Sequence, residues 1–175
     1  MPISNNNFKS FLYRYTPIIL LFTSILNEID FNNLGLKYFS FNFAYILIFY
    51  YSVRRSDSMG YVFIFIAGLF NDVVSGIPMG ISSLSYLLLC AAGVYLRNIT
   101  LRPNIIKDWI FFLITVLVLN FITFTYLIVF FSYEINYFDQ MINIIFTFLL
   151  YFVFSFLFKF YDEAILGTFN AKWKF

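Results

Sequence analysis

The chain has 175 residues, of which 62% are hydrophobic and only 11% are charged, and its net charge is +2. Soluble domains carry roughly 25% charged residues, and a domain this small buries too little surface to shield so much apolar side chain from water. The composition therefore argues against a soluble globular protein and predicts an all-α integral membrane protein, for which lipid is the solvent.

Six apolar segments follow one another along the chain, and each is predicted to be a transmembrane helix. They cover residues 11–29, 38–53, 61–75, 81–96, 109–131 and 141–160. A helix needs roughly 20 residues to cross the hydrocarbon core, so we expect the shorter second, third and fourth helices to be tilted or irregular. The first segment follows Lys9 and Arg14 as a signal peptide would, but no small-residue cleavage site follows it, and we interpret it as an uncleaved helix.

The basic residues alternate between the two sides of this predicted bundle. Ten of the eleven Lys and Arg residues fall at the two ends of the chain or in the second and fourth connections, whereas Lys37 alone lies in the first. Cytoplasmic loops carry the excess of Lys and Arg in membrane proteins. The pattern predicts a single transmembrane domain, residues 1–175, with both termini in the cytoplasm.

One polar motif interrupts the apolar sequence: residues 67–85 read AGLFNDVVSGIPMGISSLS. A carboxylate inside a membrane costs about 2.5–3.5 kcal/mol on insertion scales, so Asp72 should have a structural or functional reason to be there. Gly68, Asp72 and Gly76 are spaced four apart, which places them on one helical face that a second backbone could approach closely. Gly76, Pro78 and Gly80 should then break the helix near the outer surface.

Three groups are candidates for stabilising Asp72 as an anion. They are the positive N-terminal end of the fourth helix, the outer residue Lys37, and a partner protein. Ser82 and Ser83 are placed to cap that fourth helix. The alternative is that the motif is a plain tight turn between two helices, with Asp72 at the water interface.

The segment GLFNDVVSGIPMG resembles the signature of the MreD family of bacterial rod shape-determining proteins, in which Gly-Leu-x-x-Asp precedes a small-residue turn with Pro-x-Gly. The matching residues are Gly68, Leu69, Asp72, Gly76, Pro78 and Gly80. Arg54 and Arg55 also fit, because two basic residues precede the motif helix in that family, although Ser56 stands where a proline is common.

This resemblance implies a six-helix fold similar to that of the substrate-binding subunits of energy-coupling-factor transporters. It also implies a place in the inner membrane beside an MreC-type protein. There the chain would help to couple the cytoplasmic MreB filament to the enzymes of lateral peptidoglycan synthesis. We expect no catalytic activity, cofactor, metal site or nucleic-acid partner.

Two other functions are weighed against this one. A vitamin transporter subunit would need a polar pocket, for which the candidates are Asn42, Asn71, Asn120, Thr123 and Asn143. Each is more typical of a residue that satisfies the backbone or a neighbouring helix, and the first helix lacks an Ala-x-x-x-Ala docking pattern.

A lipid-modifying enzyme would need paired acids on one helical face. Asp162 and Glu163 are adjacent and do not share one, and His, the commonest general base, is absent. Cys90 is the single cysteine and lies in an apolar run.

Overall fold

The computed structural model describes residues 5–26, 41–55, 59–100, 104–132 and 136–170, and the side chains of 15–25, 41–55, 59–100, 104–132 and 136–162. This part of the chain is helical and contains no strand. Its six helices are α1 (Asn5–Leu26), α2 (Phe43–Arg54), α3 (Tyr61–Ser75), α4 (Ile81–Ile99), α5 (Ile105–Phe131) and α6 (Tyr137–Asn170). The predicted all-α class and the order of six helices are confirmed.

The helix boundaries depart from the predicted ones in two ways. Helix α2 begins at Phe43 rather than at 38, because Asn42 caps it, whereas α1, α4, α5 and α6 continue into polar residues past their apolar parts. α5 begins at Ile105 rather than 109, because the Asn104 side chain accepts a hydrogen bond from the backbone N–H of Ile106 at 3.0 Å and caps the first turn. α6 begins at Tyr137 and runs to Asn170, well beyond the predicted 141–160. α3 and α4 begin at residues 61 and 81 as predicted, since Gly60 and Gly80 mark their starts.

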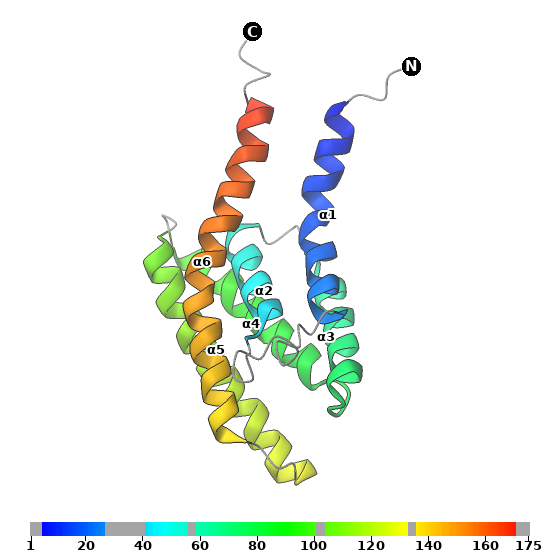
Figure 1. Ribbon diagram of the computed structural model, residues 1–175, viewed down its shortest axis with the longest axis vertical. Helices are drawn as coiled ribbons and strands as arrows, with labels where there is room; N and C mark the ends of the chain where they lie inside the picture. The colour runs from blue at the N-terminus through cyan, green and yellow to red at the C-terminus, as the bar shows by residue number, and fades with distance from the viewer. Residues whose placement is uncertain (1–4, 27–40, 56–58, 101–103, 133–135, 171–175) are drawn as a thin grey trace, which may run out of the picture.

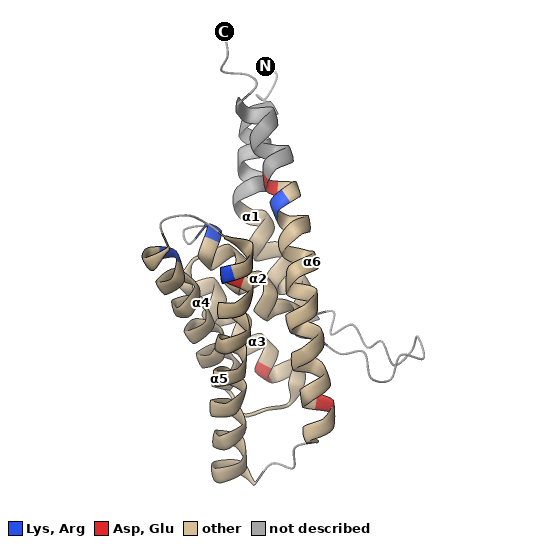
Figure 2. Cartoon of the chain, turned by 90° about the vertical axis from the view of Figure 1, so that its left-hand side faces the viewer, with Lys and Arg blue, Asp and Glu red and all other residues tan. Residues whose placement is uncertain are grey.

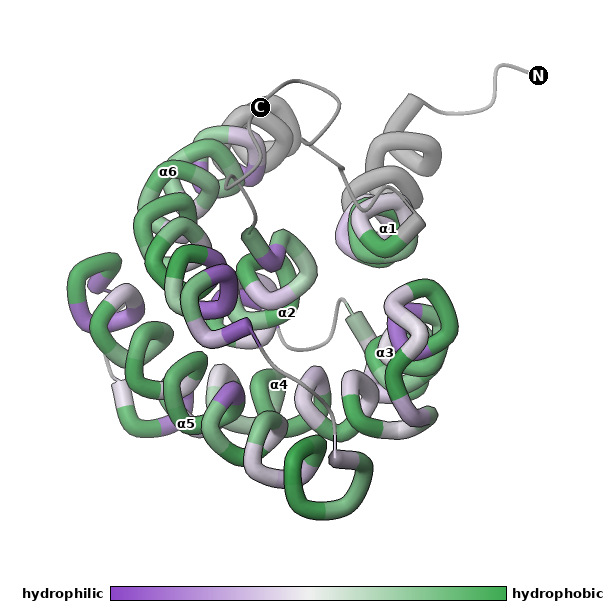
Figure 3. The backbone as a smooth tube through the Cα atoms, turned by 60° about the horizontal axis from the view of Figure 1, so that its bottom comes forward, coloured by the Kyte–Doolittle hydropathy of each residue, from purple (hydrophilic) through white to green (hydrophobic). Residues whose placement is uncertain are grey.

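Helix α2 is the centre of the bundle. Every residue from Ala44 to Val53 is buried, and α2 packs against α1, α4, α5 and α6 (Figure 3). The Phe49 ring lies 5.1 Å from the Phe112 ring of α5 and 5.7 Å from the Tyr151 ring of α6, measured between centroids. With 12 residues, α2 is about 18 Å long, which is shorter than the hydrocarbon core of a bilayer.

Two helices of the described chain are long and apolar enough to cross a membrane: α5 and the Tyr137–Asp162 part of α6. Only 22% and 17% of their most apolar stretches are buried, and Phe121, Phe130 and Phe160 are each more than two-thirds exposed. Large contiguous apolar surfaces are rare on soluble monomers, so this exposure is compatible with lipid around α5 and α6. The crossing of the membrane by all six helices stays a prediction.

The first turns of α1 and the last turns of α6 lie at the same end of the molecule and extend past the other helices (Figure 1). At the opposite end the α5–α6 hairpin reaches beyond the turn between α3 and α4 (Figures 1 and 2). Because the start of α1 and the end of α6 lie at the same end of the molecule, the arrangement agrees with an even number of passes through the bundle.

Candidate functional site

The polar motif forms the turn that joins α3 to α4. Helix α3 ends at Ser75, and Gly76 follows with φ of 65°, a left-handed conformation that glycine adopts without strain. Gly80 has φ of 101° and directly precedes α4. Pro78 lies between them in the non-helical stretch. The predicted break of the helix at Gly76, Pro78 and Gly80 is therefore present.

The side chain of Asp72 closes this turn from the inside. It is fully buried, and its two carboxylate oxygens accept hydrogen bonds from the backbone N–H groups of Gly80 at 2.6 Å and Ser82 at 2.8 Å. These donors belong to the first turn of α4, where a helix has N–H groups without partners inside the helix and the positive end of its dipole. Asp72 of α3 thus caps α4.

The backbone carbonyl of Asp72 is also engaged at this turn. It accepts the N–H of Gly76 and the N–H of Ile77, the latter at 3.1 Å. One residue therefore terminates α3 with its backbone and starts α4 with its side chain. This geometry explains why an acid at this position suits an otherwise apolar region.

Close backbone contact between α3 and α4 surrounds the capped turn. A Cβ atom on Gly68 would lie 2.3 Å from the Cα and 2.6 Å from the backbone nitrogen of Ser83. The Ser83 hydroxyl donates to the Phe65 carbonyl at 3.1 Å, and the Asn71 amide donates to the Ser82 hydroxyl at 2.9 Å. The small residue at 68 lets two serines of α4 bond directly to α3.

Three expectations about the motif need correction. Ser82 and Ser83 do not cap α4, because their hydroxyls bond to α3 and the capping side chain is that of Asp72. Gly76 is not part of a packed helical face: it lies past the end of α3, exposed, and a Cβ atom on it would have no neighbour within 4 Å. Asp72 is not at a water interface, as the plain-turn alternative required, since it is fully buried.

Of the three groups considered as stabilisers of Asp72, the structure shows the N-terminal end of α4. Lys37 lies outside the described residues. Leu69 follows the buried Gly68 and is partly exposed. The Gly68 and Asp72 side of α3 faces α4 of the same chain.

The five polar residues considered as a ligand pocket make hydrogen bonds to different partners. Asn71 bonds to Ser82, Thr123 lies 3.1 Å from the Ser85 hydroxyl, and the Asn120 amide donates to the Val116 carbonyl of its own helix.

Asn42 and Asn143 both contact Thr147 of α6. The Asn42 backbone N–H donates to the Thr147 hydroxyl at 2.9 Å, and that hydroxyl lies 3.4 Å from the Asn143 side-chain oxygen. Each of the five residues thus has a hydrogen-bond partner, either on its own helix or on a neighbouring one.

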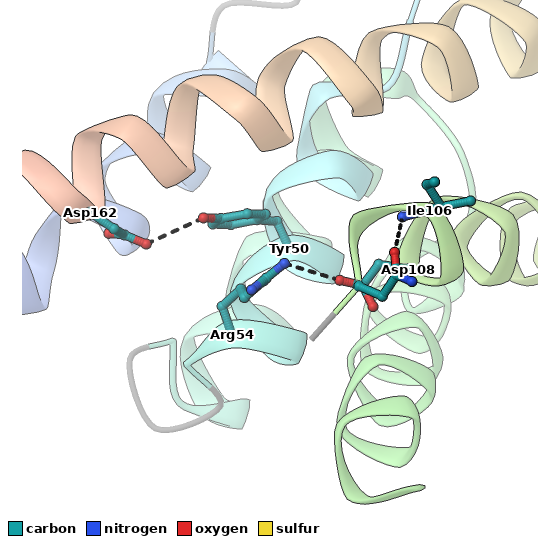
Figure 4. A network of polar contacts seen from close by, with 6 residues as sticks. Tyr50, Arg54, Ile106, Asp108 and Asp162 are labelled. Carbon is teal, nitrogen blue, oxygen red and sulfur yellow. Dashed lines mark hydrogen bonds and ion pairs between the residues drawn. The ribbon is translucent and has the colours of Figure 1, made fainter. Parts of the chain in front are cut away.

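A second polar cluster, which the sequence analysis did not anticipate, lies where α2 ends. Arg54 pairs with Asp108 in the first turn of α5 at 3.3 Å, and Arg55 pairs with Asp162 of α6 at 3.5 Å. The Tyr50 hydroxyl donates to the second oxygen of Asp162 at 3.4 Å (Figure 4). The only signal in the sequence was the presence of acids near the predicted ends of two helices on the same side as Arg54 and Arg55.

Across the described residues, no three His, Cys, Asp or Glu side chains gather in a group that could hold a metal ion. Comparison of the chain with models of protein families, with curated proteins and with solved structures found no match. A proposal about function therefore depends on the geometry above and on the motif resemblance.

Proposed function

We propose that the chain is an MreD-type protein of the bacterial inner membrane. In this proposal it crosses the membrane six times, has no catalytic activity, and works in the cell-elongation machinery beside an MreC-type protein. Through that partner it would couple the cytoplasmic MreB filament to lateral peptidoglycan synthesis.

The observation that carries the proposal is the capped turn between α3 and α4. The residues that resemble the MreD signature are the ones with defined tasks there: Asp72 caps α4, Gly76 and Gly80 adopt positive φ, and Gly68 admits the α4 backbone. A motif that builds one turn in this way supports a structural role for its acid rather than a chemical one.

Three further acids among the described residues are engaged in ion pairs or hydrogen bonds, which supports the proposal of a non-catalytic protein. Asp108 and Asp162 are paired with arginines, and Asp139 accepts a hydrogen bond from the Asn136 amide at 2.7 Å. Groups that act as general acids or bases are expected in a cleft within reach of a substrate. Asp108 and Asp162 instead join α5 and α6 to the end of α2, and Asp139 bonds to Asn136, which directly precedes its own helix.

The membrane arrangement is supported by the outward apolar surface of the helices. Large apolar side chains are exposed along α3, α5 and α6, for example Val62 of α3, Val129 of α5 and Phe156 of α6. Lipid or the apolar helix of a partner would cover such faces. α2, which is short and buried on all sides, would cross only together with the residues that flank it.

The partner surface in this proposal differs from the face first suggested by the glycine spacing. Because Gly68 and Asp72 face α4, an MreC-type helix would contact the outward side of α3 or the exposed sides of α5 and α6. The capped turn would then act indirectly, by holding α3 and α4 in the position that presents those sides.

Depletion in the bacterium that carries the chain tests the proposal. Loss of the protein should turn rods into round cells, and wild-type protein should restore rods. Asp72→Ala should fail to restore them when its level in the membrane equals that of wild type. Val73→Ala is the matched control, because Val73 is the next residue and is 60% exposed.

Purification separates the proposal from the transporter alternative. An affinity-tagged chain, extracted in mild detergent, should carry a single-helix periplasmic protein of the MreC type with it. Normal rods after complete depletion would overturn the elongation role. Tight capture of a vitamin by the purified chain, without an MreC-type partner, would replace it with the transporter function.

A further inference from the structure

Two consecutive arginines at the end of α2 reach two different helices. Arg54 is the last residue of α2, and Arg55 follows it with a non-helical backbone, φ of −151° and ψ of 67°. Consecutive residues on a helix already point about 100° apart, and the change of backbone at Arg55 adds to this separation. Arg54 therefore pairs with Asp108 of α5 (Figure 4), while Arg55 pairs with Asp162 of α6.

The apolar packing of α6 against α2 ends just before Asp162. Phe158 is buried, and its ring lies 5.3 Å from the Tyr50 ring and 5.7 Å from the Tyr51 ring, measured between centroids. Lys159 and Phe160 are exposed. Phe158 is thus the last buried apolar residue of α6 among those whose side chains are described.

Beyond Phe158, α6 contacts the rest of the bundle through polar side chains. The two carboxylate oxygens of Asp162 accept hydrogen bonds from Tyr50 of α2 and from Arg55, which follows α2. The Tyr161 hydroxyl lies 3.3 Å from the Thr16 hydroxyl of α1. Helix α6 then continues to Asn170, at the end of the molecule where α1 begins. The point at which α6 leaves the bundle is therefore contacted by α1 and by the end of α2.

We propose that Tyr50, Arg55 and Asp162 form a polar clamp that sets the direction in which the last turns of α6 leave the bundle. Hydrogen bonds and ion pairs depend on angle and distance, whereas apolar burial is non-directional, so a clamp placed after the last apolar anchor controls direction. The neighbouring pair of Arg54 and Asp108 has a separate task, which is to hold the start of α5 against α2.

The two pairs differ in how they are buried, which supports separate tasks. Asp108 keeps only 4% of its side-chain exposure and lies in the first turn of α5, whereas Asp162 keeps 13% and lies 8 residues before the end of a 34-residue helix. Breaking the Arg54 pair should leave a buried acid inside the bundle. Breaking the Arg55 pair should free the end of α6 and leave the bundle folded.

Distance measurement between spin labels tests the clamp in the full chain. Labels are placed at Ser10→Cys of α1 and Thr168→Cys of α6 in a Cys90→Ser background, and the protein is reconstituted in phosphatidylethanolamine–phosphatidylglycerol vesicles. Arg55→Gln should broaden and shift the distance distribution while the thermal unfolding midpoint stays near that of the parent. Arg54→Gln, the matched control, should lower the midpoint and leave the width of the distribution unchanged.

A charge exchange keeps the test decisive if a single variant folds poorly. Arg55→Asp combined with Asp162→Arg should return the distribution toward that of the parent, whereas each single change should broaden it. The clamp is refuted if Arg55→Gln leaves the distribution unchanged, if Arg54→Gln broadens it as much, or if the exchanged pair stays as broad as the single variants. The readout is a distance in purified protein, so it is independent of the role proposed in cell elongation.

Discussion

Gly68 of α3 and Ser83 of α4 are in such close contact that a methyl group on Gly68 would lie 2.3 Å from the Ser83 Cα atom. The obstructing atoms are backbone, so the two helices would have to separate to admit it. Gly68→Ala should therefore destabilise the protein by about 1–3 kcal/mol, the usual cost of overpacking. Unfolding in detergent, followed by helical circular dichroism, measures the change against Val73→Ala as the exposed control.

Adding Ser83→Gly should not restore the stability lost in Gly68→Ala. The second substitution removes the Ser83 side chain but leaves the obstructing backbone atoms in place. Full recovery in that double variant would show that the contact is made by side chains instead.

At the contact between Gly93 of α4 and Ser52 of α2, in contrast, we expect a second substitution to recover stability. A Cβ on Gly93 would lie 2.7 Å from the Ser52 Cβ, which is a side-chain atom. Gly93→Ala should destabilise the protein. Adding Ser52→Gly should restore part of the lost stability, because it removes the obstructing Cβ, although a new glycine inside a helix itself costs about 1 kcal/mol. The same unfolding assay on the two single variants and the double variant gives the answer; equal stability of Gly93→Ala and the double variant would contradict it.

Replacement of Asp72 by asparagine tests the cap itself. The carboxylate accepts one backbone N–H on each oxygen, whereas an amide has one oxygen and would turn its own N–H₂ toward the second donor. Asp72→Asn should lose about 1–3 kcal/mol for one unsatisfied buried donor, and Asp72→Ala should lose more because both donors are left unsatisfied. An Asn variant as stable as wild type would mean that the second hydrogen bond contributes nothing.

The sequence was most informative where glycine and proline interrupt the apolar pattern. Gly60, Gly76 and Gly80 bound α3 and α4 so sharply that three of the four ends of these helices match their predicted positions. The start of α5 and both ends of α6 were misplaced, whereas α5 ends at residue 131 as predicted. Apolar windows stop at the first polar residues, while Asn104 caps α5 and Tyr137 already belongs to α6.

The side-chain partners were harder to predict than the helices. The N-terminal end of α4 was one of three candidate partners of Asp72, and the sequence offered it because only a short turn separates the two. Ser82 and Ser83 are typical capping residues by type, but a carboxylate from α3 occupies the donors they would have used. Arg54 and Asp108 are 54 residues apart, and nothing local in the chain indicates that the end of α2 meets the start of α5.

A double-mutant cycle should show strong coupling between Arg54 and Asp108. Arg54→Gln leaves the Asp108 carboxylate buried without its cation. Breaking a buried ion pair in this way lowers the free energy of unfolding by about 3 kcal/mol or more, and we expect a loss near 3 kcal/mol because the Arg54 side chain is 23% exposed. The double variant with Asp108→Asn removes both charges and should recover most of this loss. Additive effects of the two single variants would show that the pair is not coupled.

The ends of the α5 helix should lie on opposite sides of the membrane if the chain crosses it as proposed. Single cysteines at Thr100 and Asn136, which flank α5, are introduced in the Cys90→Ser background and treated in intact cells with a membrane-impermeant maleimide. Asn136→Cys should react in whole cells and Thr100→Cys only after the cells are opened, because basic residues favour the cytoplasmic side. Cysteines at Ser10 and Thr168 should both behave like Thr100→Cys, since an even number of crossings returns the chain to the side on which it began. Labelling of Asn136→Cys and Thr100→Cys from the same side would mean that α5 does not cross, and the six-helix arrangement would have to be abandoned.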